Sequence, residues 1–366
     1  MVVRTQAPDF FLFLAAVALT VIGIVMVFSS SSYAAMLSHH DPFYYLKRQG
    51  MWAVLALAAM FFAARVDYFR LERWANSFFL LSLFLLVLVL VGGLATKGAV
   101  RWLSLGPLTF QPSELVKLAL VLYLARGLAR KQDRLESFKE GILPPLVVLG
   151  VAAGLVLAQP DLGTAIILAG TTYLMLFAAG ARPSHLSLLA VAGIAATLAA
   201  IVGEEYRLER LLAFRNPEAD PQGAGFQTLQ SLLALGSGRL FGVGLGFSRQ
   251  KFLYVPEQHT DFIFAILGEE LGFVGCLAVL ILLFVVIWRG TRVALLAPNA
   301  FGRLLASGIT SMLAFQALIN LGVVTGTLPV TGITLPFVSY GGSSLLVTLA
   351  AVGVLLNLSR HTAPAT

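Results

Sequence analysis

Residues 10–28 of this chain read FFLFLAAVALTVIGIVMVF, a continuous apolar run without one charged side chain. An α-helix needs about 20 such residues to cross the hydrocarbon core of a bilayer. The run is not followed by a convincing small-residue cleavage site, so we interpret it as a retained membrane helix and not as a signal peptide. This stretch indicates a membrane protein.

Apolar blocks of the same kind recur along the chain, separated by charged or Gly/Pro-rich stretches. Of the 366 residues, 58% are hydrophobic and only 12% are charged, whereas about a quarter are charged in an ordinary soluble domain. We therefore expect an all-α polytopic membrane protein, a single domain over residues 1–366 with about ten transmembrane helices. The expected spans are residues 10–28, 51–64, 77–94, 113–128, 142–158, 162–180, 186–202, 262–288, 304–324 and 344–358.

The distribution of Lys and Arg predicts the orientation, because short cytoplasmic loops carry an excess of both. With the N-terminus inside, the inner segments hold 14 basic residues and the short outer loops hold four. Both termini are therefore expected in the cytoplasm, with one long extracytoplasmic loop, residues 203–261, before the eighth span. The apolar runs 229–235 and 240–245 in this loop argue against disorder. We expect the loop to fold back onto the membrane surface.

Several classes of protein are disfavoured by the sequence. The net charge is +7, but the basic residues are scattered singly between apolar blocks, so no nucleic-acid partner is expected. Cys276 is the only cysteine, which leaves no intrachain disulfide and suggests a packing role. The chain also lacks a Gly-Lys-Ser/Thr phosphate loop, His-Glu-x-x-His, paired cysteines and Gly-x-Ser-x-Gly. A soluble nucleotide-driven or zinc enzyme does not fit.

Two polar motifs lie at the predicted outer ends of spans, where an ionisable group is costly and is therefore a candidate site. In QPSELVK, residues 111–117, Glu114 and Lys117 are three apart and share one helical face, so they can pair. The pair either belongs to a site or merely allows two charges to be buried. In QPDLGT, residues 159–164, Asp161 precedes a helix, and a capping role is favoured over a site role.

A third motif places ionisable groups at the start of the eighth span. It reads YVPEQHTDFIF, residues 254–264, and Asp261 meets the lipid boundary directly. Partial desolvation there would raise the pKa of the carboxyl and make it a usable general base. A helix N-cap with His259 as a bystander is the competing interpretation. About two turns further on lie Glu269 and Glu270, and because adjacent side chains diverge on a helix, at most one should face a given interior site.

The last motif, PVTGITLPFVSYGGSS at residues 329–344, cannot form a continuous helix because of its prolines and glycines. Irregular backbone at membrane level is tolerated only where it packs in protein or lines a cavity. Its amides and its hydroxyls, including Ser339 and Ser343, could hold phosphate or sugar. A purely structural re-entrant turn is the alternative.

Together these stretches resemble the FtsW/RodA/SpoVE family, also called SEDS proteins, over nearly the whole chain. The resemblance is carried in order and spacing by residues 111–117, 159–164, 230–238, 256–272 and 328–344. The run GVGLGFSRQK at residues 242–251 is more similar to the division-type FtsW branch than to RodA. Arg239 departs from the pattern, since the family usually continues a glycine run there.

The resemblance implies a peptidoglycan glycosyltransferase that joins lipid II into glycan strands at the outer face of the cytoplasmic (inner) membrane, in division or elongation, beside a class B penicillin-binding protein. Asp261 would be the essential acid and would take the proton from the acceptor sugar's 4-hydroxyl. The departing lipid pyrophosphate would need a basic residue or a divalent cation, Mg or Mn; no other cofactor is implied. Candidate basic residues are Arg101, Lys117, Arg210 and Arg249. Further candidates for binding or lining the cavity are Glu114, Asp161, His259, Glu270, Ser339 and Ser343.

Two other classes stay open. A lipid II flippase would use the same polar groups to shield a headgroup in transit, but it needs a polar path to the inner face. Four of the five polar clusters lie at predicted outer ends, and only Glu269 and Glu270 begin such a path. A non-catalytic scaffold for cell-wall enzymes would leave Asp261 and Glu114 replaceable without loss of polymer.

Overall fold

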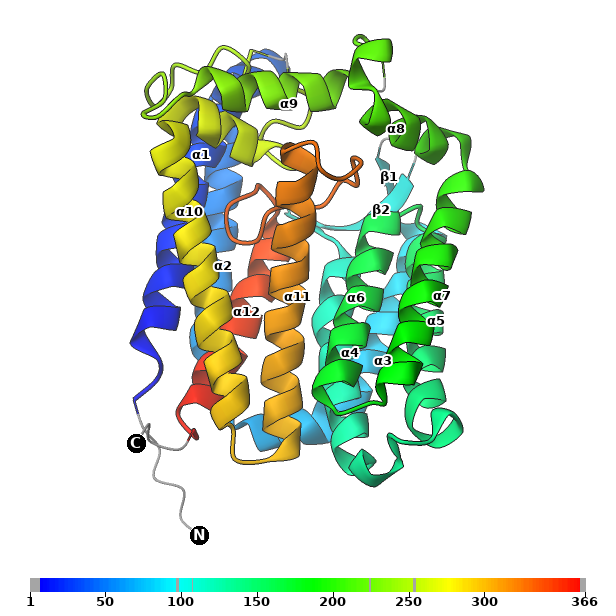
Figure 1. Ribbon diagram of the computed structural model, residues 1–366. Helices are drawn as coiled ribbons and strands as arrows, with labels where there is room; N and C mark the ends of the chain where they lie inside the picture. Colours follow the sequence, from blue (N-terminus) through cyan, green and yellow to red (C-terminus); the bar gives the residue numbers. More distant parts are fainter. Residues whose placement is uncertain (1–6, 97–98, 107, 224, 253–254, 363–366) are drawn as a thin grey trace.

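The computed structural model describes residues 7–96, 99–106, 108–223, 225–252 and 255–362. Within these ranges ten long helices stand side by side as one bundle (Figure 1), and each predicted span falls on one of them. They are α1 (Phe10–His39), α2 (Tyr44–Arg65), α3 (Tyr68–Gly92), α4 (Pro112–Arg130), α5 (Leu143–Leu157), α6 (Leu162–Ala178), α7 (Pro183–Val202), α10 (Ile263–Leu296), α11 (Ala300–Val324) and α12 (Gly342–Ser359).

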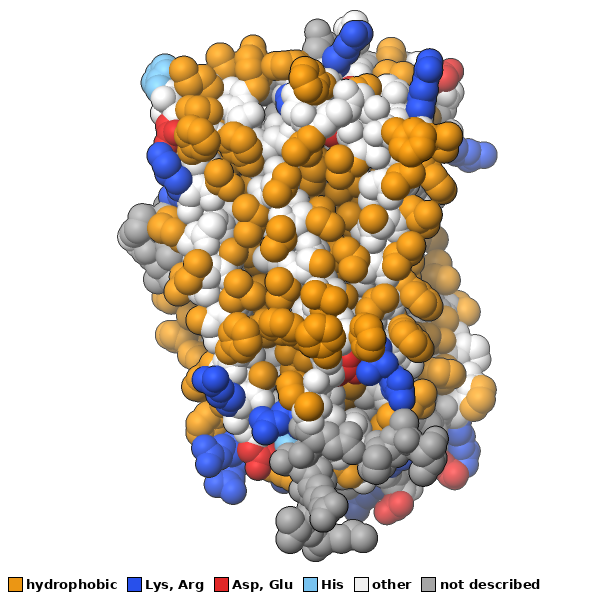
Figure 2. All heavy atoms as spheres, turned by 90° about the vertical axis from the view of Figure 1, so that its left-hand side faces the viewer, with side chains coloured by type: hydrophobic (Ala, Val, Ile, Leu, Met, Phe, Trp, Pro, Cys, Tyr) orange, Lys and Arg blue, Asp and Glu red, His pale blue; other side chains and the backbone are white. Residues whose placement is uncertain are grey.

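Length and composition make the bundle a multi-pass membrane protein. Among the described residues, seven helical stretches are long and apolar enough to cross a bilayer: α1, α3, Phe138–Leu157, α7, α10, α11 and α12. The helix α6 is apolar but shorter. Figure 2 shows hydrophobic side chains covering the middle of the face that carries α1 and α10, with Lys and Arg gathered toward both ends. This is the surface that a lipid-embedded helix bundle requires.

The helices differ in how far they are enclosed. In the apolar stretch of α12, 89% of the residues are buried within the protein, compared with 6% in α7. The helix α12 packs mainly against α2 and also contacts α1, α4, α10 and α11, while α7 packs only against α6 and α8 (Glu205–Arg215) among the main contacts. The core of the bundle therefore surrounds α12, and α7 forms an edge.

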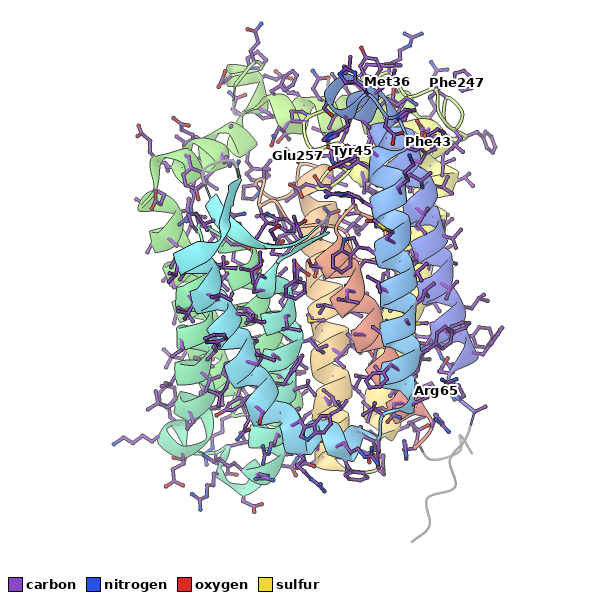
Figure 3. The ribbon with its side chains drawn as sticks, turned by 180° about the vertical axis from the view of Figure 1, so that it is seen from behind. Met36, Phe43, Tyr45, Arg65, Phe247 and Glu257 are labelled. Carbon is purple, nitrogen blue, oxygen red and sulfur yellow. The ribbon has the colours of Figure 1, made fainter. Side chains whose placement is uncertain are left out.

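The two ends of the bundle are distinguished by labelled residues. Tyr45, Phe247 and Glu257 lie at one end, called here the upper end, and Arg65 lies at the opposite, lower end (Figure 3). The start of α1 and the end of α12 meet at the lower end, because the main-chain N–H of Asp9 donates to Ser359 Oγ at 3.0 Å. Asp9 also pairs with Arg289 of α10. Two short helical turns, η1 (Gln132–Arg134) and η2 (Phe138–Ile142), join α4 to α5.

The described part of residues 203–261 folds over the upper end of the bundle (Figure 1). They form α8, a short turn η3 (Pro217–Ala219) and α9 (Phe226–Ser237). The helix α9 packs on α10 and α11, and Ser231 Oγ donates to the main-chain carbonyl of Val324 at 2.7 Å. The segment is therefore an ordered part of the bundle.

The chain is all-α as expected, apart from one short segment. Between α3 and α4 lies a three-stranded antiparallel sheet of β1 (Leu94–Thr96), β2 (Ala99–Leu105) and β3 (Leu108–Phe110). Leu105 pairs with Leu108, and Gly106 takes a φ of +65°, a conformation that glycine adopts without strain. The tight turn explains why the chain cannot continue as helix here.

The eighth predicted span, residues 262–288, falls on α10, and this helix is kinked at Gly272. Gly272 has φ 68° and ψ −165° inside α10, and these angles break the helix. Before this break, residues 263–270 are all buried, whereas large apolar side chains such as Phe273 and Phe284 are exposed after it. A helical segment buried on all sides lies inside protein. The lipid-facing part of α10 therefore begins after Gly272.

The break in α10 is bridged by residues 239–244 of the preceding loop. The main-chain N–H groups of Phe273 and Val274 donate to the carbonyls of Arg239 and Leu240, at 2.9 and 3.1 Å. The carbonyls of Glu269 and Glu270 accept from the N–H groups of Val243 and Gly244, at 2.9 and 3.0 Å. The loop thus replaces the two helical hydrogen bonds that the kink removes, which keeps buried backbone groups paired.

Candidate active site

Asp261 lies in the turn that leads into α10, at the upper end of the bundle. The N-cap of α10 is Phe262, which makes no side-chain cap hydrogen bond, so Asp261 lies one residue before the N-cap position. The residue is partly exposed, and a Cβ placed on Gly332 would lie 3.7 Å from Asp261 Oδ2. The carboxylate therefore faces the loop between α11 and α12.

That loop, residues 325–341, is irregular and packed in the protein, as the sequence predicts. Leu335, Phe337 and Val338 are buried. Ser339 Oγ accepts from the N–H of Leu335 at 2.8 Å and donates to the carbonyl of Thr260 at 2.6 Å. The N–H of Tyr340 donates to the carbonyl of His259 at 2.9 Å. These bonds fasten the loop to the residues directly before Asp261.

Asn320 of α11 links the turn at Asp261 to the 325–341 loop. Its side-chain amide donates to the main-chain carbonyl of Asp261 at 2.8 Å and to that of Ile333 at 2.7 Å. Asn320 is buried, and a buried amide with this role is a positioning group for Asp261. We did not single it out from the sequence; the signal was an uncharged amide within an apolar span, which is as informative there as a charge.

The predicted pairing of Glu114 and Lys117 is confirmed. The Lys117 ammonium lies 2.8 Å from Glu114 Oε2, and both residues are buried. The same ammonium donates to Gln316 Oε1 at 2.7 Å, and the Gln316 amide donates to the carbonyl of Thr334 at 3.0 Å. The ion pair thus reaches the 325–341 loop through Gln316, which lies four residues before Asn320 and on the same face of α11.

Aromatic rings gather beside His259. The His259 ring lies 4.6 Å from the Tyr45 ring and 5.5 Å from the Tyr340 ring, between centroids, and the two tyrosines are 5.1 Å apart. Burial raises the pKa of Tyr340, and a hydrogen bond with Arg48 partly opposes the rise. The phenol therefore stays protonated at neutral pH and can donate a hydrogen bond.

Three other sequence candidates stabilise the frame of the upper end. Asp161 caps α6 by accepting from the N–H and Oγ1 of Thr164, at 3.0 and 2.8 Å, as its capping interpretation predicted. Arg101 of β2 donates to the carbonyl of Gln159 at 2.8 Å and also to that of Pro160. Ser343 Oγ accepts from the N–H of Gln111 at 2.9 Å, which joins the start of α12 to α4.

Among the described residues, no hydrogen bond connects Asp261 to Arg210 or to Arg249. Arg210 is exposed on α8, with its guanidinium 5.8 Å from the centre of the Tyr206 ring. Arg249 is exposed in the loop before α10, where its main-chain N–H donates to Glu269 Oε1 at 2.9 Å.

The expectation that only one of Glu269 and Glu270 faces a given site is wrong. Glu270 accepts from Ser29 Oγ at 2.8 and 2.6 Å and pairs with Lys251 at 3.3 Å, while Glu269 accepts from Ser248 Oγ. Both carboxylates contact residues 248–251, because that segment packs against the part of α10 before Gly272. They fix an upper-end loop and so do not begin a polar path toward the lower end.

The expectation of a divalent cation, Mg or Mn, stays a prediction. Over the described residues, no group of three or more His, Cys, Asp or Glu side chains lies close enough together to hold an ion. Mg²⁺ is usually bound through one or two carboxylates together with substrate phosphates and water, so Asp261 could hold it only with the substrate present.

Comparison with known proteins identifies the family of this chain. The family model described as "Cell cycle protein", for FtsW, RodA and SpoVE, matches residues 10–364. The chain belongs to the FtsW/RodA/SpoVE family. It is 47% identical to the stage V sporulation protein E of Bacillus subtilis (strain 168) over 363 residues, which are 99% of each chain. It is 47% identical to the probable peptidoglycan glycosyltransferase FtsW of Geobacter metallireducens, over 96% of this chain and 95% of that one.

Solved structures of the FtsW/RodA/SpoVE family share the fold. One is a chain of a peptidoglycan synthase complex, described as coordinating polymerization and crosslinking, with a TM-score of 0.79, 36% identity, and 97% of this chain and 98% of that chain covered. Another is the rod shape determining protein RodA of Thermus thermophilus, with a TM-score of 0.73, 34% identity and 97% of each chain covered. The resemblance inferred from the motifs is confirmed.

Proposed function

We propose that this protein is a peptidoglycan glycosyltransferase that polymerises lipid II, supported by its relatives named as such. The observation that carries the proposal is the position of Asp261. Its main chain is held by Asn320, and its carboxylate faces the 325–341 loop. A carboxylate fixed in this way at a partly desolvated turn suits general base catalysis.

In the proposed reaction, Asp261 takes the proton from the acceptor's 4-hydroxyl while that oxygen attacks the donor's anomeric carbon. The new glycosidic bond forms as the bond from that carbon to the pyrophosphate oxygen breaks, and the lipid pyrophosphate leaves. Because the leaving group is already good, most of the catalytic effect comes from positioning two lipid-anchored sugars. The packed loop, the His259 ring and Ser339 are proposed to shape that position.

The charge of the leaving pyrophosphate needs a partner outside the buried ion pair. Lys117 is committed to Glu114 and Gln316, so we propose it as a stabilising group of the cavity wall. Arg101 donates to main-chain carbonyls and not to a carboxylate, and we propose it as the cationic partner. Assays with Mg²⁺, Mn²⁺ and EDTA test whether the substrate brings a divalent cation of its own.

The topology and the partner complete the proposal. We propose ten spans in the cytoplasmic (inner) membrane, both termini in the cytoplasm and the upper end outside, on the strength of the 14 to 4 distribution of basic residues. Substrate would then be used at the outer face. A class B penicillin-binding protein is the proposed partner, supported by the related synthase complex. The FtsW-like loop at residues 242–251 favours a role in division over elongation.

The experiment that tests the function is lipid II polymerisation by the purified protein, with and without its partner. Asp261→Asn keeps the size of the side chain and removes the proton acceptor, so glycan polymer should fall by about a hundredfold or more while the protein still folds and binds its partner. Asp261→Glu should recover little, because the carboxylate moves by about one methylene. Wild-type polymer from folded Asp261→Asn protein would reject the mechanism. A loss of lipid II crossing in proteoliposomes, with polymerisation unchanged, would instead indicate a flippase.

A further inference from the structure

A pocket lies at the edge of the upper end, between the end of α9 and the loop that bridges the kink in α10. Its volume is about 930 Å³, and its walls include Arg239, Phe241, Phe247, Arg249 and Glu269. Phe247 projects at the outer edge of the bundle (Figure 3). No hydrogen bond among the described residues links the two arginines to the Asp261 turn, so the pocket is a separate feature.

Arg239 occupies a backbone position that disfavours it. Its φ is +49°, in the left-handed region where glycine is free of strain and other residues are not. The conformation cannot relax, because the carbonyl of Arg239 accepts from the N–H of Phe273 across the kink in α10. A strained residue in a pocket wall suggests that its side chain has a use there.

The two guanidinium groups of the pocket lack an acidic partner. Over the described residues, the side chains of Arg239 and Arg249 make no hydrogen bond or ion pair, and both residues are exposed. The acid in the pocket wall, Glu269, already accepts from Ser248 Oγ and from the N–H groups of Arg249 and Gln250. The nearby Lys251 is matched by Glu270. The donors to Glu269 are all neutral, so its carboxylate offsets one of the two guanidinium charges, and the pocket wall carries a net charge of +1.

Large apolar side chains stand beside these charges. Leu240, Phe241, Val243 and Phe247 in the pocket wall are between 45% and 79% exposed. A soluble anion would bind the arginines and leave these side chains in water, whereas an amphiphile would cover both kinds of surface. Because guanidinium groups match phosphate oxygens in geometry and charge, we propose that this pocket binds the phosphate group of a membrane lipid, with the lipid chain along the apolar wall.

The phosphate could come from a glycerophospholipid or from a polyprenyl diphosphate, and the test separates them. The full-length protein in a neutral detergent is titrated with phosphatidylglycerol, phosphatidylcholine or undecaprenyl diphosphate, and bound lipid is counted by native mass spectrometry. Three variants are compared: Arg239→Gly, Arg249→Gln and the double variant. Arg215→Gln is the matched control, since Arg215 is also exposed at the upper end but lies outside the pocket wall.

We expect the double variant to bind at least one of the two anionic lipids about tenfold more weakly or worse, since charge-assisted hydrogen bonds to phosphate are lost. The lipid whose binding weakens identifies the source of the phosphate group. Arg239→Gly should unfold at no lower temperature than the parent, because glycine relieves the φ strain, so its lost binding is not a folding defect. Unchanged binding of both anionic lipids, equal weakening in Arg215→Gln, or equal affinity for phosphatidylcholine would overturn the proposal. The readout is lipid binding, so this result and that of the polymerisation assay are independent.

Discussion

The side-chain amide of Asn320 holds the main-chain carbonyl of Asp261 at 2.8 Å, from a helix that begins 39 residues later in the chain. The same amide holds Ile333 of the facing loop. The proposed base is therefore positioned through its backbone. This relationship leads to the first prediction.

Asn320→Ala should lower polymerisation by at least about tenfold while lipid II binding changes little, since an acid-base group loses its alignment and the binding surface remains. The buried carbonyl of Ile333 would also lose its donor, at a cost of about 1 to 3 kcal/mol in the free energy of unfolding. Separate measurement of kcat and KM, with the melting temperature in detergent, checks both effects. Equal kcat in the folded variant would show that Asn320 does not position Asp261.

The ion pair of α4 gives the second prediction. Lys117→Met leaves the buried Glu114 without its cation, so the free energy of unfolding should fall by about 3 to 5 kcal/mol. The double variant Glu114→Leu with Lys117→Met removes both charges and should fold better than either single variant. Thermal unfolding of the purified proteins decides the order. If both single variants are as stable as the parent, the pair contributes nothing to the fold.

The third prediction concerns the close contact between the loop and α10. A Cβ on Gly242 would lie 2.1 Å from the carbonyl oxygen of Glu270, at a φ of +77°, whereas Gly246 has a φ of +84° and open space around it. Gly246→Ala should therefore cost about 1 to 2 kcal/mol from backbone strain alone. Gly242→Ala should cost about 1 to 3 kcal/mol more, because the backbones must move apart. Similar melting temperatures for the two variants would contradict this account.

The fourth prediction is topological. In a chain with Cys276 replaced by alanine, single cysteines at positions 134 and 220 should differ in their reaction with a membrane-impermeant thiol reagent on intact cells. Position 220 lies in the upper-end segment and should be labelled, while position 134, between α4 and α5, should be protected until the cells are permeabilised. Labelling at 134 and not at 220 would invert the proposed orientation.

Local patterns in the sequence predicted several features correctly. Apolar run lengths predicted the ten bundle helices, and the spacing of three residues predicted the contact between Glu114 and Lys117. The place of Asp161 before an apolar block predicted its cap of α6. Each of these depends on residues within one or two helical turns, where backbone geometry alone fixes which side chains meet.

Features that depend on distant segments were missed. The kink at Gly272 is stable only because residues 239–244 supply the missing hydrogen bonds. Nothing in the local sequence of α10 indicates that this segment is its partner. Gln316 and Asn320 were overlooked because only ionisable groups were treated as costly in the membrane, although a buried amide also requires partners. The alternation of apolar and polar residues around Arg101 is typical of a short strand, but the long apolar runs on both sides made this pattern hard to recognise.

The enclosure of α12 has a consequence for biosynthesis. This helix follows the other nine bundle helices along the chain, so a ribosome produces it after all of them, yet it is the element around which α1, α2, α4, α10 and α11 assemble. Until it emerges, α2 lacks its main packing partner, and the main-chain N–H of Tyr68 and the carbonyl of Ala64 lack the Asn357 side chain that pairs with both. The packing of α2 into the core is therefore completed only after α12 has been synthesised.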